Sequence, residues 1–366
     1  MYIKSIALNN FRNYTSQSVE LSKNLNVIIG KNAQGKTNLL EAIFLCAIGK
    51  SPRTNKDKDL INWEKNFAKI TLNVAKNEGN HVIDLYLFNN QNKAIKIDKI
   101  PIKKIGQLLG TFNAVYFSPD ELKLIKESPE ERRRFMDIDL CQFDKMYFYN
   151  LNKYNQILQQ RNKLLKSTDE KSLKDTLPIW DEQLSTYGAK IILSRVKLIE
   201  SIKLHAKKIH AYLTNNQENL ELEYAGFVAD SEEDLKNLLL DKLSSAIEKD
   251  IRLGFTSVGP HRDDIKITSN GIDLRSFGSQ GQQRTASLTL KLSELEFFKS
   301  SIHEYPVLLL DDVLSELDEN RQTKLLEYVK NIQTIITCTD FDYNIPHVKY
   351  YIENGSVKNV VNSNIK

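Results

Sequence analysis

The sequence predicts an α/β fold in which an antiparallel β subdomain and a helical second domain accompany a sheet of buried strands. Three observations lead to this prediction. A buried strand, a glycine loop and a helix follow one another within residues 25–48, a second buried strand at 307–310 ends in two carboxylates, and helical periodicity dominates residues 129–250. We therefore expect residues 1–128 and 251–366 to form one head, interrupted by a helical insertion at 129–250.

The composition is that of a folded chain whose charges are nearly balanced. Its 366 residues suffice for about two domains, and 41% of them are hydrophobic. Lys and Arg number 51 against 47 Asp and Glu, so any nucleic-acid site must be a local basic patch. No apolar run approaches the ~18 residues of a membrane span, the N-terminus is typical of a strand rather than a signal peptide, and Cys46, Cys141 and Cys338 are widely spaced. We expect a cytoplasmic protein with reduced thiols and no membrane partner.

The first 128 residues predict a strand–loop–helix unit flanked by antiparallel strands. Residues 2–9 and 25–29 are predicted strands, and 37–48 has helical spacing. Alternating and short buried runs predict further strands at 67–74, 81–88, 94–97 and 114–117.

The middle of the chain predicts two long helices packed side by side. Apolar side chains recur at alternating spacings of four and three over residues 147–165 and 180–212, with Arg161 as an exception. The polar segment 166–175 is the predicted turn. This pattern fits a short coiled-coil arm and a plain helical core equally well.

After the helix pair the chain returns to β/α character. Ser231 and Asp234 have the spacing of a capping box, which predicts a helix to about residue 248. A strand at 307–310, a helix at 319–332 and a strand at 333–337 are expected to follow.

The glycine loop carries the pattern GxxxxGK[ST]. It consists of Gly30, Lys31, Asn32, Ala33, Gln34, Gly35, Lys36 and Thr37. Between a buried strand and a helix, such a loop curls its backbone N–H groups around phosphates and adds the positive end of the helix. Lys36 is positioned to reach the outer phosphates and Thr37 to hold Mg²⁺. The sequence therefore predicts a site for ATP.

Two carboxylates follow the buried strand at 307–310. Asp311 is a predicted Mg²⁺ ligand, directly or through water, as the strand-end carboxylate of a phosphate-loop protein. Asp312 is then the candidate that orients or deprotonates an attacking water. Lys36, Asp311 and Asp312 are thus the predicted catalytic residues.

A third segment begins a helix near residue 280. Ser279 and Gln282 have capping-box spacing around Gly281. This helix start is either a second anion site, suited to a γ-phosphate, or merely a capped terminus. A single chain with two phosphate-binding helix starts requires an explanation.

Several segments together resemble a known family. They are LNNFRNY at 8–14, GKNAQGKTNLLEAI at 30–43, SPEERRRFMD at 128–137, SQGQQ at 279–283, GPHRDD at 259–264 and LLLDDVLSELD at 308–318. The combination is similar to ABC-type ATPases of the SMC branch and, over nearly the whole chain, to the bacterial RecF family. The resemblance implies an ABC-type ATPase head.

The resemblance also implies a function. The family comprises weak ATPases that dimerise with ATP on gapped or single-strand/double-strand junction DNA, independently of sequence. They act with RecO and RecR to load recombinase in recombinational repair, replication maintenance and SOS induction. Ser279, Gly281 and Gln282 would cover the nucleotide held by the other copy, which explains the second anion site. Asp312 stands where transporters have Glu, so turnover is expected to be slow.

Other positions have open interpretations. Thr339 and Asp340 are weak candidates for the γ-phosphate sensor, and residues 117–120 are the candidate Q-loop region. Arg12 fits either a phosphate or DNA contact or a solvated arginine, whereas His261 is more typical of a structural histidine.

Three basic segments are candidate DNA contacts, although each also fits a solvated surface. They are Lys50, Arg53, Lys56 and Lys58; Lys93, Lys96, Lys99, Lys103 and Lys104; and Arg132–Arg134. No base-reading motif is present, so DNA binding is expected to depend on the backbone or on DNA structure.

Three other functions share the phosphate loop. They are the ATPase subunit of an ABC transporter, another SMC-like DNA-tethering ATPase, and a phosphate-loop kinase or nucleotide sensor. The long insertion between Lys36 and Ser279 argues against a transporter subunit.

Overall fold

The computed structural model describes residues 1–166 and 170–363. The chain forms two compact units. The first unit comprises Met1–Leu122, Ile209–Asn216 and Arg284–Lys366, and the second comprises Lys123–Lys208 and Gln217–Gln283. Among the described helices, none is long and apolar enough to cross a membrane.

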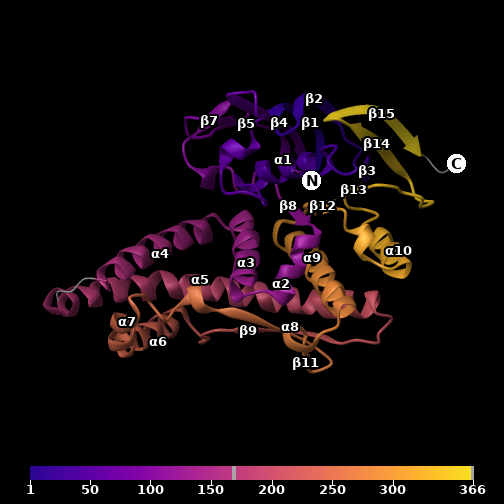
Figure 1. The fold of residues 1–366 in the computed structure, drawn as a ribbon. Helices are drawn as coiled ribbons and strands as arrows, with labels where there is room; N and C mark the ends of the chain where they lie inside the picture. Colours follow the sequence, from indigo (N-terminus) through magenta and orange to yellow (C-terminus); the bar gives the residue numbers. More distant parts are fainter. Residues whose placement is uncertain (167–169, 364–366) are drawn as a thin grey trace. The chain divides into compact units, whose positions relative to one another are not determined.

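The first unit contains a six-stranded sheet built from both ends of the chain (Figure 1). Its order is β15 (Ser356–Ser363), β14 (His347–Glu353), β3 (Leu25–Ile29), β13 (Thr334–Cys338), β12 (Val307–Asp311) and β8 (Ala114–Phe117). The strands from β14 to β8 are parallel, and β15 is antiparallel at the edge. Every residue of β3, β8, β12 and β13 is buried, as parallel sheets covered on both faces require.

A second sheet of the first unit is antiparallel. Its order is β2 (Tyr14–Glu20), β1 (Tyr2–Phe11), β4 (Phe67–Lys76), β5 (Gly79–Phe88), β6 (Ala94–Ile97) and β7 (Ile100–Ile102). Buried side chains alternate with more exposed ones along β4 and β5, so one face lines the core and the other faces water. The helices of this unit include α1 (Lys36–Ile48) and α10 (Glu319–Tyr328).

The second unit is mainly helical. Its helices are α2 (Lys123–Lys126), α3 (Pro129–Phe143), α4 (Lys145–Leu164), most of α5 (Glu170–Leu213), α6 (Glu232–Ser245), α7 (Ile247–Leu253) and α8 (Leu274–Phe277). A small sheet has the order β11 (Ile272–Asp273), β10 (Asp264–Ser269) and β9 (Leu220–Ala225). α9 (Gln280–Ile302) begins in this unit and continues in the first.

The predicted strands and helices are present, with ends shifted by a few residues. The N-cap half of the capping box predicted at Ser231 is present, because the Ser231 side chain accepts a hydrogen bond from the Asp234 amide. The turn predicted at 166–175 is wrong for residues 170–175, which belong to α5; residues 167–169 lie outside the described part. The polar composition suggested a longer turn than the helix pair needs.

The end of the helix pair is packed rather than free. Leu165, Leu173 and Leu177 form a buried cluster against Ile247 and Ile251 of α7. This packing favours the interpretation of the helix pair as a plain helical core rather than a coiled-coil arm.

Arg161 interrupts the apolar stripe because it is the centre of a buried ion cluster. Its side chain is fully buried and its guanidinium donates to Asp181 at 2.5 Å, to Asp250 at 2.7 Å and to Thr256 at 3.0 Å. The cluster joins α4, α5 and α7. Burial raises the pKa of Asp181, and the guanidinium opposes that rise.

Replacing Arg161 with Met is expected to destabilise the second unit by about 3–5 kcal/mol, because two buried carboxylates would lose their shared cation. Thermal unfolding measures the effect. Lys203→Met on α5 is the control, since Lys203 is 47% exposed beside Glu200 and its loss should change stability by less than about 0.5 kcal/mol. Equal shifts in the two variants would contradict the role of Arg161.

Candidate functional site

The glycine loop lies between β3 and α1, where two glycines are required by close contacts. Gly35 has φ +113°, and a Cβ there would lie 2.7 Å from the Asn13 side chain. A Cβ on Gly30 would lie 2.5 Å from the Ile352 carbonyl oxygen. Lys36 begins α1, and its buried ammonium donates to the carbonyls of Gly30 at 2.5 Å and Lys31 at 3.1 Å. The lysine is therefore folded back over the loop.

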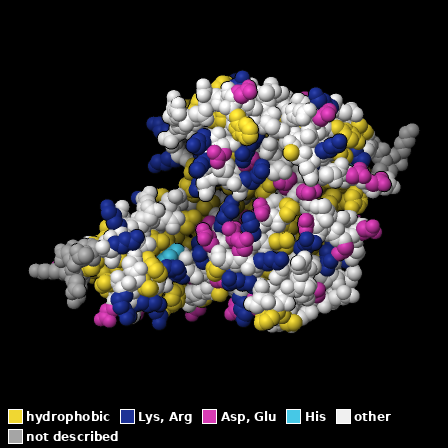
Figure 2. Space-filling model, in the orientation of Figure 1, with side chains coloured by type: hydrophobic (Ala, Val, Ile, Leu, Met, Phe, Trp, Pro, Cys, Tyr) yellow, Lys and Arg dark blue, Asp and Glu magenta, His cyan; other side chains and the backbone are white. Residues whose placement is uncertain are grey.

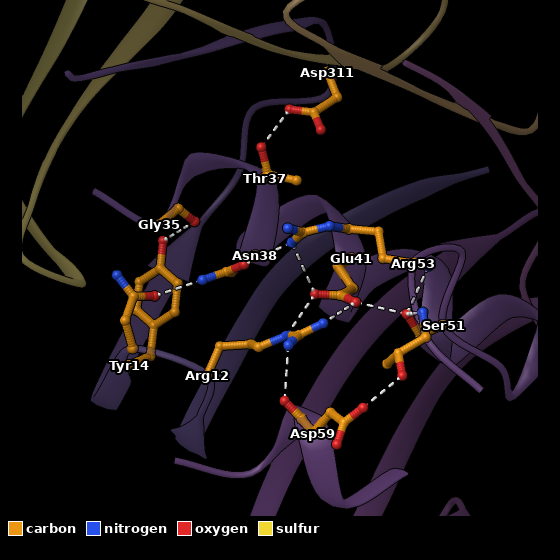
Figure 3. Close-up of polar contacts among 12 residues, drawn as sticks. Arg12, Tyr14, Gly35, Thr37, Asn38, Glu41, Ser51, Arg53, Asp59 and Asp311 are labelled. Carbon is orange, nitrogen blue, oxygen red and sulfur yellow. Dashed lines mark hydrogen bonds and ion pairs between the residues drawn. The ribbon is translucent and has the colours of Figure 1, made fainter. Parts of the chain in front are cut away.

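Two side chains and one backbone amide hold this loop. Asn13, in the β1–β2 turn, donates to the Gln34 carbonyl at 2.9 Å. Tyr14, the first residue of β2, donates to the Gly35 carbonyl at 2.9 Å (Figure 3). The amide of Gly355, in the β14–β15 turn, donates to the same Gln34 carbonyl at 3.0 Å. Asn13 and Tyr14 were part of the resemblance but had no predicted role; the structure makes them supports of the loop.

Asp311 accepts hydrogen bonds from three hydroxyl groups on three separate segments. Thr37 donates to its Oδ1 at 2.9 Å and Thr337 to the same oxygen at 2.7 Å, while Tyr116 donates to Oδ2 at 3.0 Å. The Thr37 contact appears in Figure 3. Burial and the Asp311 charge raise the pKa of Tyr116 well above its usual value, so the phenol remains a donor.

The oxygen set at Asp311 fits a small hard cation. A threonine hydroxyl and an aspartate carboxylate meet beside the glycine loop, and Mg²⁺ prefers oxygen ligands and shares its site with phosphates. Thr337 was not singled out from the sequence, although its place at the end of the adjacent parallel strand β13 is the signal that identifies it.

Asp312 has a constrained backbone. Its φ is +53°, which is uncommon for a residue with a side chain. Its amide donates to the Thr337 hydroxyl at 2.9 Å, so Thr337 contacts both neighbouring aspartates. Burial raises the pKa of the Asp312 carboxyl, nearby Lys36 opposes the rise and Asp311 adds to it. A carboxylate with a raised pKa is a better proton acceptor.

The weak sensor candidates lie just beyond β13. Thr339 and Asp340 are exposed, and Asp340 accepts a hydrogen bond from the Phe341 amide at 2.8 Å. The candidate Q-loop region follows β8, where Pro119–Leu122 forms a 3-10 turn. Within this strand end, Thr337 is the residue that contacts the carboxylate pair.

The segment at Ser279 belongs to the second unit and has the predicted capping box. The Gln282 amide donates to the Ser279 hydroxyl at 3.2 Å, and the Gln282 side chain accepts from the Ser279 amide at 3.0 Å. A Cβ on Gly281 would meet nothing within 4 Å. The space beside the Gly281 α-carbon is therefore open.

Arg12 is engaged inside the first unit. Its guanidinium donates to both oxygens of fully buried Glu41, at 2.9 and 2.8 Å, and to the Asp59 carbonyl at 2.8 Å (Figure 3). Glu41 also accepts from Ser51 at 2.6 Å and lies 3.4 Å from Arg53. Arg12 is thus a structural residue rather than a solvated one.

The GPHRDD segment is structural in the second unit. His261 bonds through one ring nitrogen to the Tyr154 hydroxyl at 2.7 Å and through the other to the Thr256 carbonyl at 2.9 Å. The structural interpretation of His261 is confirmed. Arg132, a candidate DNA contact, is buried and pairs with Asp264 at 2.5 Å, so the prediction of an exposed Arg132 is wrong.

The other two basic segments are exposed in the first unit. Lys50, Arg53, Lys56 and Lys58 lie at the surface, as do Lys99, Lys103 and Lys104. Lys93 pairs with Asp57 at 2.9 Å, which places the two segments next to each other. Figure 2 shows basic and acidic side chains interspersed on the face in view, in keeping with the small net charge.

Known proteins with similar sequences identify the family of this chain. The family model described as RecF/RecN/SMC N terminal domain matches residues 2–344. A DNA replication and repair protein RecF from Clostridium botulinum (strain Okra / Type B1) is 48% identical, with 98% of this chain and all of that protein covered. Its counterpart from Clostridium perfringens (strain SM101 / Type A) is also 48% identical, with both chains fully covered. The chain belongs to the RecF family.

Solved structures place the fold in the same family. A structure of the recombination mediator protein RecF-ATPrS in the RecFOR pathway has a TM-score of 0.91 at 39% identity, covering 97% of each chain. One of RecF-ATP has a TM-score of 0.89 at 37% identity, covering 99% of this chain and 98% of that one. An Smc head bound to the C-winged helix domain of ScpA shares the fold, with a TM-score of 0.59 at 16% identity and coverage of 100% and 98%. This RecF-family chain is therefore related to DNA replication and repair proteins, with a head like that of SMC proteins.

Two buried groups of the GPHRDD segment predict opposing effects of pH on stability. Burial lowers the pKa of His261 from 6.5 to about 4. Its contribution to folding stability is therefore present above pH 6.5 and is lost as the pH falls towards 4. Burial raises the pKa of Asp263 from 3.8 to about 6. Its contribution to folding stability is therefore present below pH 3.8 and is lost as the pH rises through 6.

Substitution should separate these effects. Relative to the parent chain, His261→Gln should become more stable as pH falls from about 6.5 to about 4, because the destabilising titration of His261 is removed. Asp263→Asn should become less stable relative to the parent over the same range, because the stabilising titration of Asp263 is removed. Thermal midpoints across this range test both. The same pH dependence in both variants would contradict the assignment.

Proposed function

We propose that this chain is an ATP-dependent DNA-binding ATPase of recombinational repair. The hydrogen bond from Thr37 to Asp311 carries the proposal, because it joins the glycine loop to the strand-end carboxylate at 2.9 Å. The RecF-ATP structure, similar over nearly the whole chain, supports ATP as the nucleotide.

The residues have distinct roles in nucleotide binding. The backbone from Gly30 to Thr37 would hold the phosphates at the start of α1. Lys36 would exchange its carbonyl contacts for the outer phosphate oxygens. Thr37 and Asp311 would hold Mg²⁺, which neutralises phosphate charge when bound.

Asp312 would position and deprotonate the attacking water. Its raised pKa and its amide hydrogen bond to Thr337 support this role. Its side chain is one methylene shorter than that of Glu and reaches less far towards a phosphate, so we expect slow hydrolysis. Slow turnover suits a protein in which the bound nucleotide acts as a signal.

A second copy would complete the nucleotide site. Ser279, Gly281 and Gln282 would approach the γ-phosphate bound by the partner, and the open space at Gly281 supports such an approach.

In this proposal residues 1–128 and 251–366 form the ATPase head and 129–250 the insertion. The ATP-joined dimer would bind gapped or junction DNA in the cytoplasm and act with RecO and RecR in recombinase loading, replication maintenance and the SOS response.

Two substitutions distinguish nucleotide binding from pairing. Lys36→Ala should weaken ATP binding at least tenfold, because the outer phosphates lose their cation, and should abolish ATP-dependent retention on DNA. Ser279→Arg should leave ATP binding by the monomer within about twofold and block pairing. Calorimetric ATP titration compares them, and equal losses of ATP affinity would contradict the two-copy site.

Nucleotide should control DNA binding. We expect at least tenfold tighter binding to a gapped duplex with ATP than with ADP or without nucleotide, and weaker binding as salt rises from about 50 to 200 mM because phosphate contacts release counterions. Fluorescence anisotropy on gapped, single-stranded and blunt duplex DNA measures this. Affinity that is independent of nucleotide on all three DNAs would overturn the proposal.

A further inference from the structure

Trp63 is a fully exposed tryptophan in the first unit. Its relative exposure is 100%, although an indole ring normally gains from burial of its large apolar surface. Phe67, four residues later, is 45% exposed. Single exposed apolar residues are ordinary, whereas a contiguous exposed apolar patch marks a binding surface.

The backbone around Trp63 is fixed on both sides. The Asn62 amide donates to the Asn10 carbonyl at 2.8 Å, and the Asn62 side chain donates to the Arg12 carbonyl at 2.9 Å. The Lys65 amide closes the turn onto the Asn62 carbonyl at 2.9 Å. Trp63 is therefore presented to solvent by an anchored turn, without a frayed backbone.

The turn that carries Trp63 leads into β4, and this strand and β5 carry further aromatic side chains. In β4 and β5, Phe67 lies opposite Phe88 and Lys69 opposite Tyr86. These residues share the face opposite to the buried alternate residues of both strands. The ammonium groups of Lys69 and Lys96 lie 5.3 and 5.6 Å from the centre of the Tyr86 ring.

We propose that this surface binds single-stranded DNA by stacking bases on its aromatic rings. We call it the basic–aromatic face, and it consists of Trp63, Phe67, Lys69, Tyr86, Phe88 and Lys96. The inference rests on the proposed DNA-binding function and assigns it a contact for unpaired bases. Aromatic rings beside cations suit single strands because every base has a π face, whereas bases in a duplex are already stacked.

The charges on this face indicate that stacking outweighs phosphate attraction. Lys69 is paired with Asp84 at 2.9 Å, and exposed Glu64 adjoins Trp63. Lys96, on β6, lies opposite Asp84 and also attracts this carboxylate, while Lys65 is exposed. Loss of Trp63 should therefore lower affinity for single strands with little change in its salt dependence.

Binding to an oligothymidylate and to a blunt duplex by the full chain with ATP tests this face. Trp63→Leu keeps an apolar side chain without a ring, and we expect about five- to hundredfold weaker binding to the single strand. Trp63→Phe should retain most of the affinity, and duplex binding should not change. Ile100→Ala is the control, since Ile100 is 68% exposed in the same sheet, and it should have no effect.

Fluorescence gives a direct readout. The chain has two tryptophans, so Trp180→Phe leaves Trp63 as the sole indole. Oligothymidylate should quench this variant and leave Trp63→Phe unquenched. If Trp63 fluorescence were not quenched, or if Trp63→Leu bound the single strand as tightly as the parent, the inference would be overturned. Binding of the gapped duplex would then still support the proposed function. A parent chain that bound no DNA would overturn both.

Discussion

The structure of the candidate site depends on the Asp311 carboxylate, which accepts hydrogen bonds from three hydroxyl groups. Thr37, Tyr116 and Thr337 come from segments up to 300 residues apart. They meet because β8, β12, β13 and β3 are consecutive parallel neighbours, and parallel strands place their carboxyl ends at one edge. A buried parallel sheet is therefore the condition for joining the glycine loop to the carboxylate pair.

The proposed second anion site has a different structural basis. The start of α9 belongs to the second unit, whose internal frame is held by buried ion pairs at Arg132, Arg161 and Arg195. Such pairs need exact partners because an unmatched buried charge is strongly unfavourable. This frame fixes the start of α9 within its unit. In the proposed function, that exposed start contacts the nucleotide held by a second copy of the chain.

Much of the fold was predictable because its strongest signals are local. The run at 25–29 is apolar enough to require burial on both faces, and the glycine loop follows it directly. The roles of Thr337 and Tyr116 were not predictable, since they depend on which strands are neighbours. Arg161 looked like a break in an apolar stripe because its partners Asp181 and Asp250 are distant in sequence. The exposure of Trp63 likewise follows from tertiary structure alone.

Sedimentation velocity of the Asp312→Asn chain tests the central claim that two copies close one nucleotide site. With hydrolysis blocked, the account predicts a dimer in ATP and Mg²⁺ and a monomer in ADP. A monomer in ATP and Mg²⁺, with gapped DNA also present, would contradict it.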